Sequence, residues 1–183
     1  MAVEGTLSSA SRITYEYMLG GGSPPIVELG QQVDTTGYRA GWPVAVDASG
    51  HAYGVSTATL TSATGVFGVA IENSATTHTT DGDVSIKVVL ATPMTVFSAV
   101  VAHATTASAT VQASQIGQVY ALTCSGTVSA ASSETMIMDV ATTASAGGWV
   151  IDNKSTTGTS YGRNYFIFSG VYATNSAYGY GTS

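Results

Sequence analysis

The side chains that most often carry chemistry are few in this chain and stand far apart. Its three histidines are His51, His78 and His103, and no two of them are separated by two or four positions. Such spacings place two imidazoles on one metal ion, so the sequence predicts no metal site and no cofactor. The stretch Asp81–Asp83 resembles the start of a calcium loop, but Thr92 occupies the place of the bidentate glutamate. We therefore interpret Asp81–Asp83 as a turn.

The chain also lacks the contexts that activate a nucleophile or bind a phosphate. The single cysteine, Cys124, excludes an internal disulfide, and its apolar neighbours indicate a small buried side chain rather than a reactive thiol. No serine stands in a G-x-S-x-G turn, and the glycine runs Gly20–Gly22 and Gly147–Gly148 do not extend to G-x-G-x-x-G. The acids that stand after apolar runs, such as Glu72 and Asp152, are isolated from other acids. The sequence therefore predicts a protein that is not an enzyme.

Composition narrows the partners that the protein can have. Charged residues make up only 9% of the 183 residues, while 44% are hydrophobic and the mean hydropathy is +0.24. These values indicate a packed protein whose uncharged surface meets other protein. Five basic residues and a net charge of −6 argue against direct nucleic-acid binding. No apolar run is long enough to span a membrane, and the first 18 residues lack the pattern of a signal peptide, so we expect a protein made and kept in a cytosol.

From Ile26 onward the pattern is a succession of short β-type runs separated by turn residues. Gly41–Gly50 places two valines on one face and ends in the turn sequence Asp-Ala-Ser-Gly. Val84–Leu90 alternates apolar and polar residues, as a half-buried strand does. The stretch Phe97–Ala104 is the most helix-like, although its β-branched residues leave its type open. The predicted fold is all-β, built from small β-sandwich or barrel units.

The ends of the chain differ from this body. Gly20–Pro25 contains three glycines and two prolines, which predicts a hinge. We expect residues 1–25 to form an extended arm with that hinge, although a frayed terminus is the alternative. Residues 26–105 then form a first β unit, and residues 106–183 form a second β unit with a Tyr/Gly-rich tail. The apolar and aromatic residues that we expect to contact a partner lie in the arm and the tail: Ile13, Tyr15, Tyr17, Met18, Tyr178 and Tyr180.

The two predicted units share turn and strand residues in the same order. Gly41 and Gly50 match Gly117 and Gly126 at an offset of 76 positions, and the stretches beginning at Gly68 and Gly148 match at an offset of 80. The shared residues are glycines at turns, an acidic residue followed by asparagine, and apolar residues at a period of two. Glycine, alanine and serine are abundant enough here to coincide by chance. The matches fit both an internal duplication and coincidence.

The stretches Gly41–Gly50, Gly65–Ile71 and Asp81–Val88 follow one another in a pattern that resembles the head-decoration, or capsid cement, proteins of tailed bacteriophages. This resemblance covers residues 37–92, with a looser echo in 115–173. It implies a β-rich body with an N-terminal arm, a homotrimer, and binding to the outside of an icosahedral capsid. It implies no enzymatic activity. The second β-rich half and the tail depart from the family pattern.

We therefore expect a structural virion protein, made in the host cytoplasm and located on the outer capsid surface, where it stabilises the capsid by bridging subunits. Its expected partners are the major capsid protein and further copies of itself, and neither nucleic acid nor membrane. Two alternatives remain. The first is another virion or filament subunit, such as a tail tube or head fibre, and the second is a carbohydrate-binding β module or glycan hydrolase domain. Polymerisation without a capsid would favour the first, and an exposed aromatic platform with paired carboxylates would favour the second.

Overall fold

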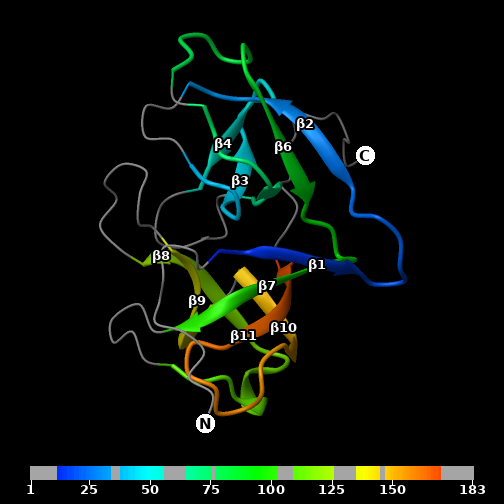
Figure 1. The fold of residues 1–183 in the computed structure, drawn as a ribbon, viewed down its shortest axis with the longest axis vertical. Helices are drawn as coiled ribbons and strands as arrows, with labels where there is room; N and C mark the ends of the chain where they lie inside the picture. The colour runs from blue at the N-terminus through cyan, green and yellow to red at the C-terminus, as the bar shows by residue number, and fades with distance from the viewer. Residues whose placement is uncertain are drawn as a thin grey trace, which may run out of the picture.

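The fold is all-β, as the sequence predicts. The computed structural model describes residues 12–33, 38–55, 65–75, 77–102, 109–125, 135–144 and 147–169. These residues form eleven strands and one short 3-10 helix, η1 (Ala113–Gln115). No helix among them is long and apolar enough to cross a membrane. The strands gather into two units that Figure 1 shows one above the other.

The first unit is a five-stranded antiparallel sheet. Its strands are β2 (Ile26–Gly30), β3 (Pro43–Val46), β4 (Ala52–Gly54), β5 (Gly68–Ala70) and β6 (Ser85–Leu90). They lie in the order β2-β6-β5-β3-β4. A single parallel bridge between Gln31 and Ala52 connects the end of β2 to the start of β4. The sheet is thereby bent round until its two outer strands meet.

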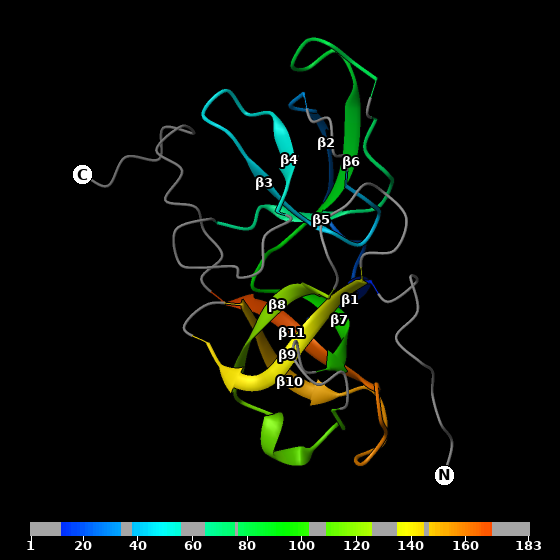
Figure 2. The same cartoon turned by 90° about the vertical axis from the view of Figure 1, so that its left-hand side faces the viewer.

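The second unit is a closed five-stranded barrel to which a sixth strand is added. The barrel strands are β7 (Thr95–Ala102), β8 (Val119–Ser125), β9 (Thr135–Thr143), β10 (Gly147–Asn153) and β11 (Arg163–Ser169). They lie in the order β7-β11-β10-β8-β9, and parallel pairing of β7 with β9 closes the barrel. The added strand is β1 (Thr14–Met18), which pairs antiparallel with β7. Strand β1 lies across the junction between the two units (Figures 1 and 2).

The two units repeat one arrangement of strands. In each, the first strand pairs with the fifth, the fifth with the fourth, the fourth with the second and the second with the third, all antiparallel. In each, the third strand also contacts the first in the parallel sense. Val44 pairs with Gly68 in the first unit, and Tyr120 pairs with Gly148 in the second. These pairs are related by the sequence offsets of 76 and 80, so the matches in the sequence coincide with a repeated structure.

The boundary between the units differs from the predicted one at residues 105 and 106. Strand β6 ends at Leu90, and β7 pairs with β1, β9 and β11 of the second unit. The units therefore meet at residues 91–94 rather than at 105. The stretch from Phe97 to Ala102, whose type the sequence left open, is the buried strand β7, as its β-branched residues favour. The repeat also fails locally, because the Asp47–Gly50 turn matches residues that continue strand β8 to Ser125.

One hydrophobic core joins the two units. The cluster contains Val44 and Ile86 from the first unit and Phe97, Phe166 and Phe168 from the second. The three phenylalanine rings contact one another at centroid distances of 5.2 to 6.0 Å, partly edge to face, an arrangement that adds to the stability gained from burial. Because the core is continuous, the relative placement of the two units is determined by packing.

Candidate functional site

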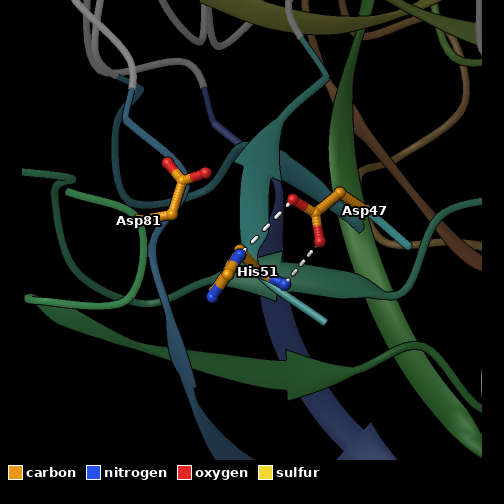
Figure 3. Close-up of side chains that lie close together, drawn as sticks. All are labelled: Asp47, His51 and Asp81. Atoms are coloured by element: carbon orange, nitrogen blue, oxygen red, sulfur yellow. Dashed lines mark hydrogen bonds and ion pairs between the residues drawn. The ribbon is translucent and has the colours of Figure 1, made fainter. Parts of the chain in front are cut away.

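A cluster of three polar side chains lies at one end of the first unit. Asp47 and His51 bracket the turn between β3 and β4, and Asp81 comes from the loop before β6 (Figure 3). Each offers one ligand atom, and these atoms lie within 4.8 Å of one another. The imidazole Nδ1 of His51 is 3.5 Å from Oδ2 of Asp47. The topology thus brings together residues that are 30 positions or more apart in the sequence.

The two carboxylates of this cluster already have fixed hydrogen bonds. Oδ1 of Asp47 accepts the backbone N–H groups of Ser49 and His51, both at 2.8 Å, and Oδ1 of Asp81 accepts that of Val33 at 2.6 Å. Burial on its own would raise the pKa of Asp47, but these backbone bonds and the adjacent imidazole hold the pKa below its ordinary value of 3.8. Asp47 therefore stays ionised and holds the turn closed.

The cluster could offer one nitrogen and two oxygen ligands to a divalent cation, a set that zinc accepts. One oxygen of each carboxylate, Oδ1 of Asp47 and Oδ1 of Asp81, already accepts hydrogen bonds from the backbone. No serine, cysteine or lysine is part of it, so it does not form a nucleophile with its base. The sequence indicated that Asp81 belongs to a turn. It did not indicate that Asp81 lies near His51, because the two residues are 30 positions apart in the sequence.

A second polar network fastens β1 to the barrel. Oε1 of Glu16 accepts hydrogen bonds from Ser98 Oγ on β7 and from Lys154 Nζ, each at 2.5 Å. Arg163 of β11 donates to Ser98 Oγ at 2.8 Å, to the carbonyl of Ser98 at 2.8 Å and to the carbonyl of Arg12 at 2.7 Å. One guanidinium thus bonds to both β7 and the residue that leads into β1.

Arg163 is partly buried. Desolvation lowers the pKa of its guanidinium, and the carboxylate of Glu16 acts in the opposite direction. A buried charge is tolerated when its hydrogen bonds are made, and this side chain donates to two carbonyls and to the hydroxyls of Ser98 and Thr14. The network is therefore a structural clamp on the N-terminal strand.

The predicted partner-binding residues of the arm have different surroundings. Ile13 is buried in the protein's own core, and Tyr15 packs edge to face against Phe97 at 6.4 Å. Both residues thus contact other residues of the same chain, and Tyr15 is only partly buried. Contact of these two residues with a partner stays a prediction. Tyr17 remains 41% exposed, and Met18 is half-buried. Tyr178 and Tyr180 lie outside the described residues.

Exposed apolar side chains gather where β1 ends. Tyr17, Leu19 and Met94 are each more than a third exposed, and the backbone N–H of Leu19 donates to the carbonyl of Met94 at 2.8 Å. We call these three residues the hinge patch. The glycines of the Gly20–Gly22 turn that follows all have positive φ, between 84° and 98°, which side chains disfavour. The predicted hinge is therefore a tight glycine turn next to an exposed apolar surface.

A cleft of about 360 Å³ lies beside the same strand. It is lined by the start of β1 and by the first unit: Arg12–Tyr15, Ala40–Gly41, Val69–Ile71 and Val89. This volume is at the low end for small-molecule sites, and Arg12 is the one charged side chain in the lining.

Comparisons with protein-family models, curated proteins and solved structures gave no match for this chain.

Proposed function

We propose that this protein is a structural virion component that binds the outer surface of an icosahedral phage capsid and stabilises it by bridging capsid subunits. The observation that carries the proposal is the N-terminal strand. Strand β1 precedes the first unit in the sequence but is added to the edge of the second, and it ends in the exposed hinge patch. A segment that adds itself to a sheet edge beyond its own unit is the element that a bridging protein needs.

The surface of the protein supports the same proposal. With only 9% charged residues, its surface is poor in the groups that keep soluble monomers apart. The hinge patch supplies a methionine, a leucine and a tyrosine, and aromatic residues and methionine are enriched in protein interfaces. Because β1 is clamped by Arg163 and Glu16, the patch is held in place by hydrogen bonds to the barrel.

The proposed mechanism is stabilisation by mass action. A protein that binds the assembled shell, and not its dissociated subunits, shifts the equilibrium toward the shell. Many copies at equivalent positions add their contributions, so modest affinity per copy suffices. Burial of the hinge patch between shell subunits would provide the apolar part of each contact.

Co-sedimentation with purified expanded shells of the phage that encodes the chain tests this proposal. We expect the full chain to pellet with shells and to raise the temperature at which they release their contents. The double variant Leu19→Ser/Met94→Ser should bind at least tenfold more weakly. Ile116→Ser, which changes an equally exposed apolar residue next to η1, is the matched control and should bind normally. A full chain that stays in the supernatant at every concentration would overturn the proposal.

A self-assembling virion subunit is the second candidate, and the free edge of β2 favours it. Among the described strands, β2 pairs with β6 alone along its length, and an unpaired strand edge can add a strand from another molecule. Formation of filaments by the purified chain without shells, seen by electron microscopy, would support this candidate. An absence of filaments together with shell binding would favour the capsid role.

A further inference from the structure

The repeat leaves one of two equivalent strand edges open. Strand β7 is the first strand of the second unit, and on the side away from β11 it pairs with β1 over Thr95–Ser98 and with β9 over Val100–Ala102. Strand β2 is the first strand of the first unit. On the side away from β6, its one pairing among the described residues is the bridge from Gln31 to Ala52. In the part of the chain that the structure describes, no strand therefore occupies the place beside β2 that corresponds to β1.

The backbone groups at this place can be identified from the pairing of β2 with β6. The carbonyl of Pro25 accepts from Leu90, and the N–H of Gln31 donates to Val84. Because hydrogen bonding alternates along an antiparallel pair, the odd-numbered residues of β2 bond to β6 and the even-numbered ones point away. Within the described chain, the backbone N–H and C=O of Ile26 and Glu28 have no partner. They are free to bond to a strand that is added from outside.

Strands β7 and β2 also differ in how far their residues are buried. Every residue of β7 is buried, whereas no residue of β2 is. Ile26 is 51% exposed, and Val27 and Leu29 pack against the core but are only partly covered. An added strand would cover these side chains, as β1 covers β7. The edge of β2 therefore offers both unpaired backbone groups and apolar area.

We propose that residues 1–11 of a second copy of this chain add a strand to the edge of β2. The strand that fills the equivalent place on β7 is the N-terminal strand β1, and residues 1–11 directly precede it. They show the alternation of a half-buried strand, with apolar or small residues at Val3, Gly5 and Leu7 and polar residues at Glu4, Thr6 and Ser8. Fully extended, eleven residues span about 36 Å, which is enough to reach a neighbouring molecule.

Pairing of β2 with β2 of another copy is less favourable, because centred antiparallel pairing places Glu28 opposite Glu28 in two chains that each carry a net charge of −6. The contact that we propose joins two different surfaces. Such head-to-tail contacts close into rings or continue as filaments. A ring of three is the form that agrees with the expected trimer. This inference stands apart from capsid binding, and its test needs no shells.

Analytical ultracentrifugation of the full chain and three variants tests the inference. Glu28→Pro removes an N–H that points away from β6, so it should block the edge and leave the pairing with β6 intact. Deletion of residues 1–11 removes the added strand. Glu28→Ala is the control, because it removes the same carboxylate and keeps the N–H. We expect oligomers from the full chain and from Glu28→Ala, and monomers from the deletion and from Glu28→Pro, all with the same far-UV circular dichroism.

Mixing the two monomeric variants makes the test decisive. The deletion variant retains an intact β2 edge, and Glu28→Pro retains an intact N-terminal segment, so together they should form a one-to-one complex. A monomeric full chain would overturn the inference. Oligomers that persist in the deletion variant but not in Glu28→Pro would also overturn it, because they would indicate pairing of β2 with β2. So would a mixture that stays monomeric.

Discussion

The carboxylate of Asp47 accepts two hydrogen bonds in the turn between β3 and β4 and lies beside the imidazole of His51. The donors are the N–H groups of Ser49 and His51, which otherwise have no acceptor at the end of β3. We expect Asp47→Ala to lower the free energy of unfolding by about 1–2 kcal/mol, the usual loss when a backbone-capping carboxylate is removed. Urea unfolding at neutral pH measures this change. Asp83→Ala, which removes an exposed carboxylate from the loop before β6, should change the stability by less than about 0.5 kcal/mol.

The same carboxylate predicts a pH dependence whose sign follows from its pKa. The hydrogen bonds hold the pKa of Asp47 in the folded protein below its ordinary value of 3.8, although burial acts the other way. Its stabilising contribution is therefore complete above pH 3.8 and is lost as the pH falls through the lower, folded pKa. Between about pH 5 and pH 2, the free energy of unfolding should fall less steeply with decreasing pH for Asp47→Asn than for the wild type. Parallel curves would show that the carboxylate is not the titrating group.

Arg163 donates hydrogen bonds both to Arg12, which leads into β1, and to Ser98 of β7. Arg163→Met should leave the carbonyls of Arg12 and Ser98 without their charged donor and cost about 2–3 kcal/mol. Faster hydrogen exchange should follow at the amides of Thr14–Met18 that pair with β7. Lys154→Met, which removes the exposed partner of Glu16, is the comparison and should cost less than about 1 kcal/mol. Equal effects of the two variants would contradict a specific role for Arg163.

At the scale of strands, the sequence predicted much of the fold, because strand patterns are local. The turn at Asp47–Gly50 and the alternation in Val84–Leu90 were sufficient to place β3, β4 and β6. The offsets of 76 and 80 matched residues that pair equivalently in the two units. The location of β1 was not predictable in this way, because its pairing with β7 joins residues about 80 positions apart. The same holds for the proximity of His51 and Asp81, which depends on how two loops are placed relative to one another.

The equivalent glycines of β5 and β10 allow a prediction about these elements. A Cβ on Gly68 would lie 2.3 Å from the carbonyl oxygen of Val89, which is backbone and cannot move alone. A Cβ on Gly148 would meet side-chain atoms of Met138 and Phe166 at 2.8 and 2.9 Å. We expect Gly68→Ala to cost about 3 kcal/mol and Gly148→Ala about 2 kcal/mol. The end of Met138 can shift, the buried Phe166 ring shifts less easily, and the backbone carbonyl of Val89 cannot shift alone. Thermal unfolding of both variants measures the difference, and the reverse order would contradict the argument.

At the scale of the whole molecule, the chain passes between its units twice. The first described strand, β1, belongs to the second unit; the chain then forms the first unit and returns to the second at β7. The shared core and the returning strand mean that neither unit can unfold without exposing apolar surface of the other. The repeat therefore describes how the strands are arranged and does not define two independent folding units.

This arrangement predicts a single cooperative unfolding transition. The two tryptophans report on it separately, because Trp42 is buried beside the first unit and Trp149 is on β10 of the second. Trp149→Phe leaves Trp42 as the fluorescent reporter, and Trp42→Phe leaves Trp149. Within each variant, the fluorescence midpoint should coincide with the midpoint from far-UV circular dichroism, and the calorimetric and van't Hoff enthalpies should agree. A fluorescence midpoint that differs from the circular dichroism midpoint would mean that the units unfold separately. The tryptophan would then report on one unit, whereas the strands of both units contribute to the circular dichroism.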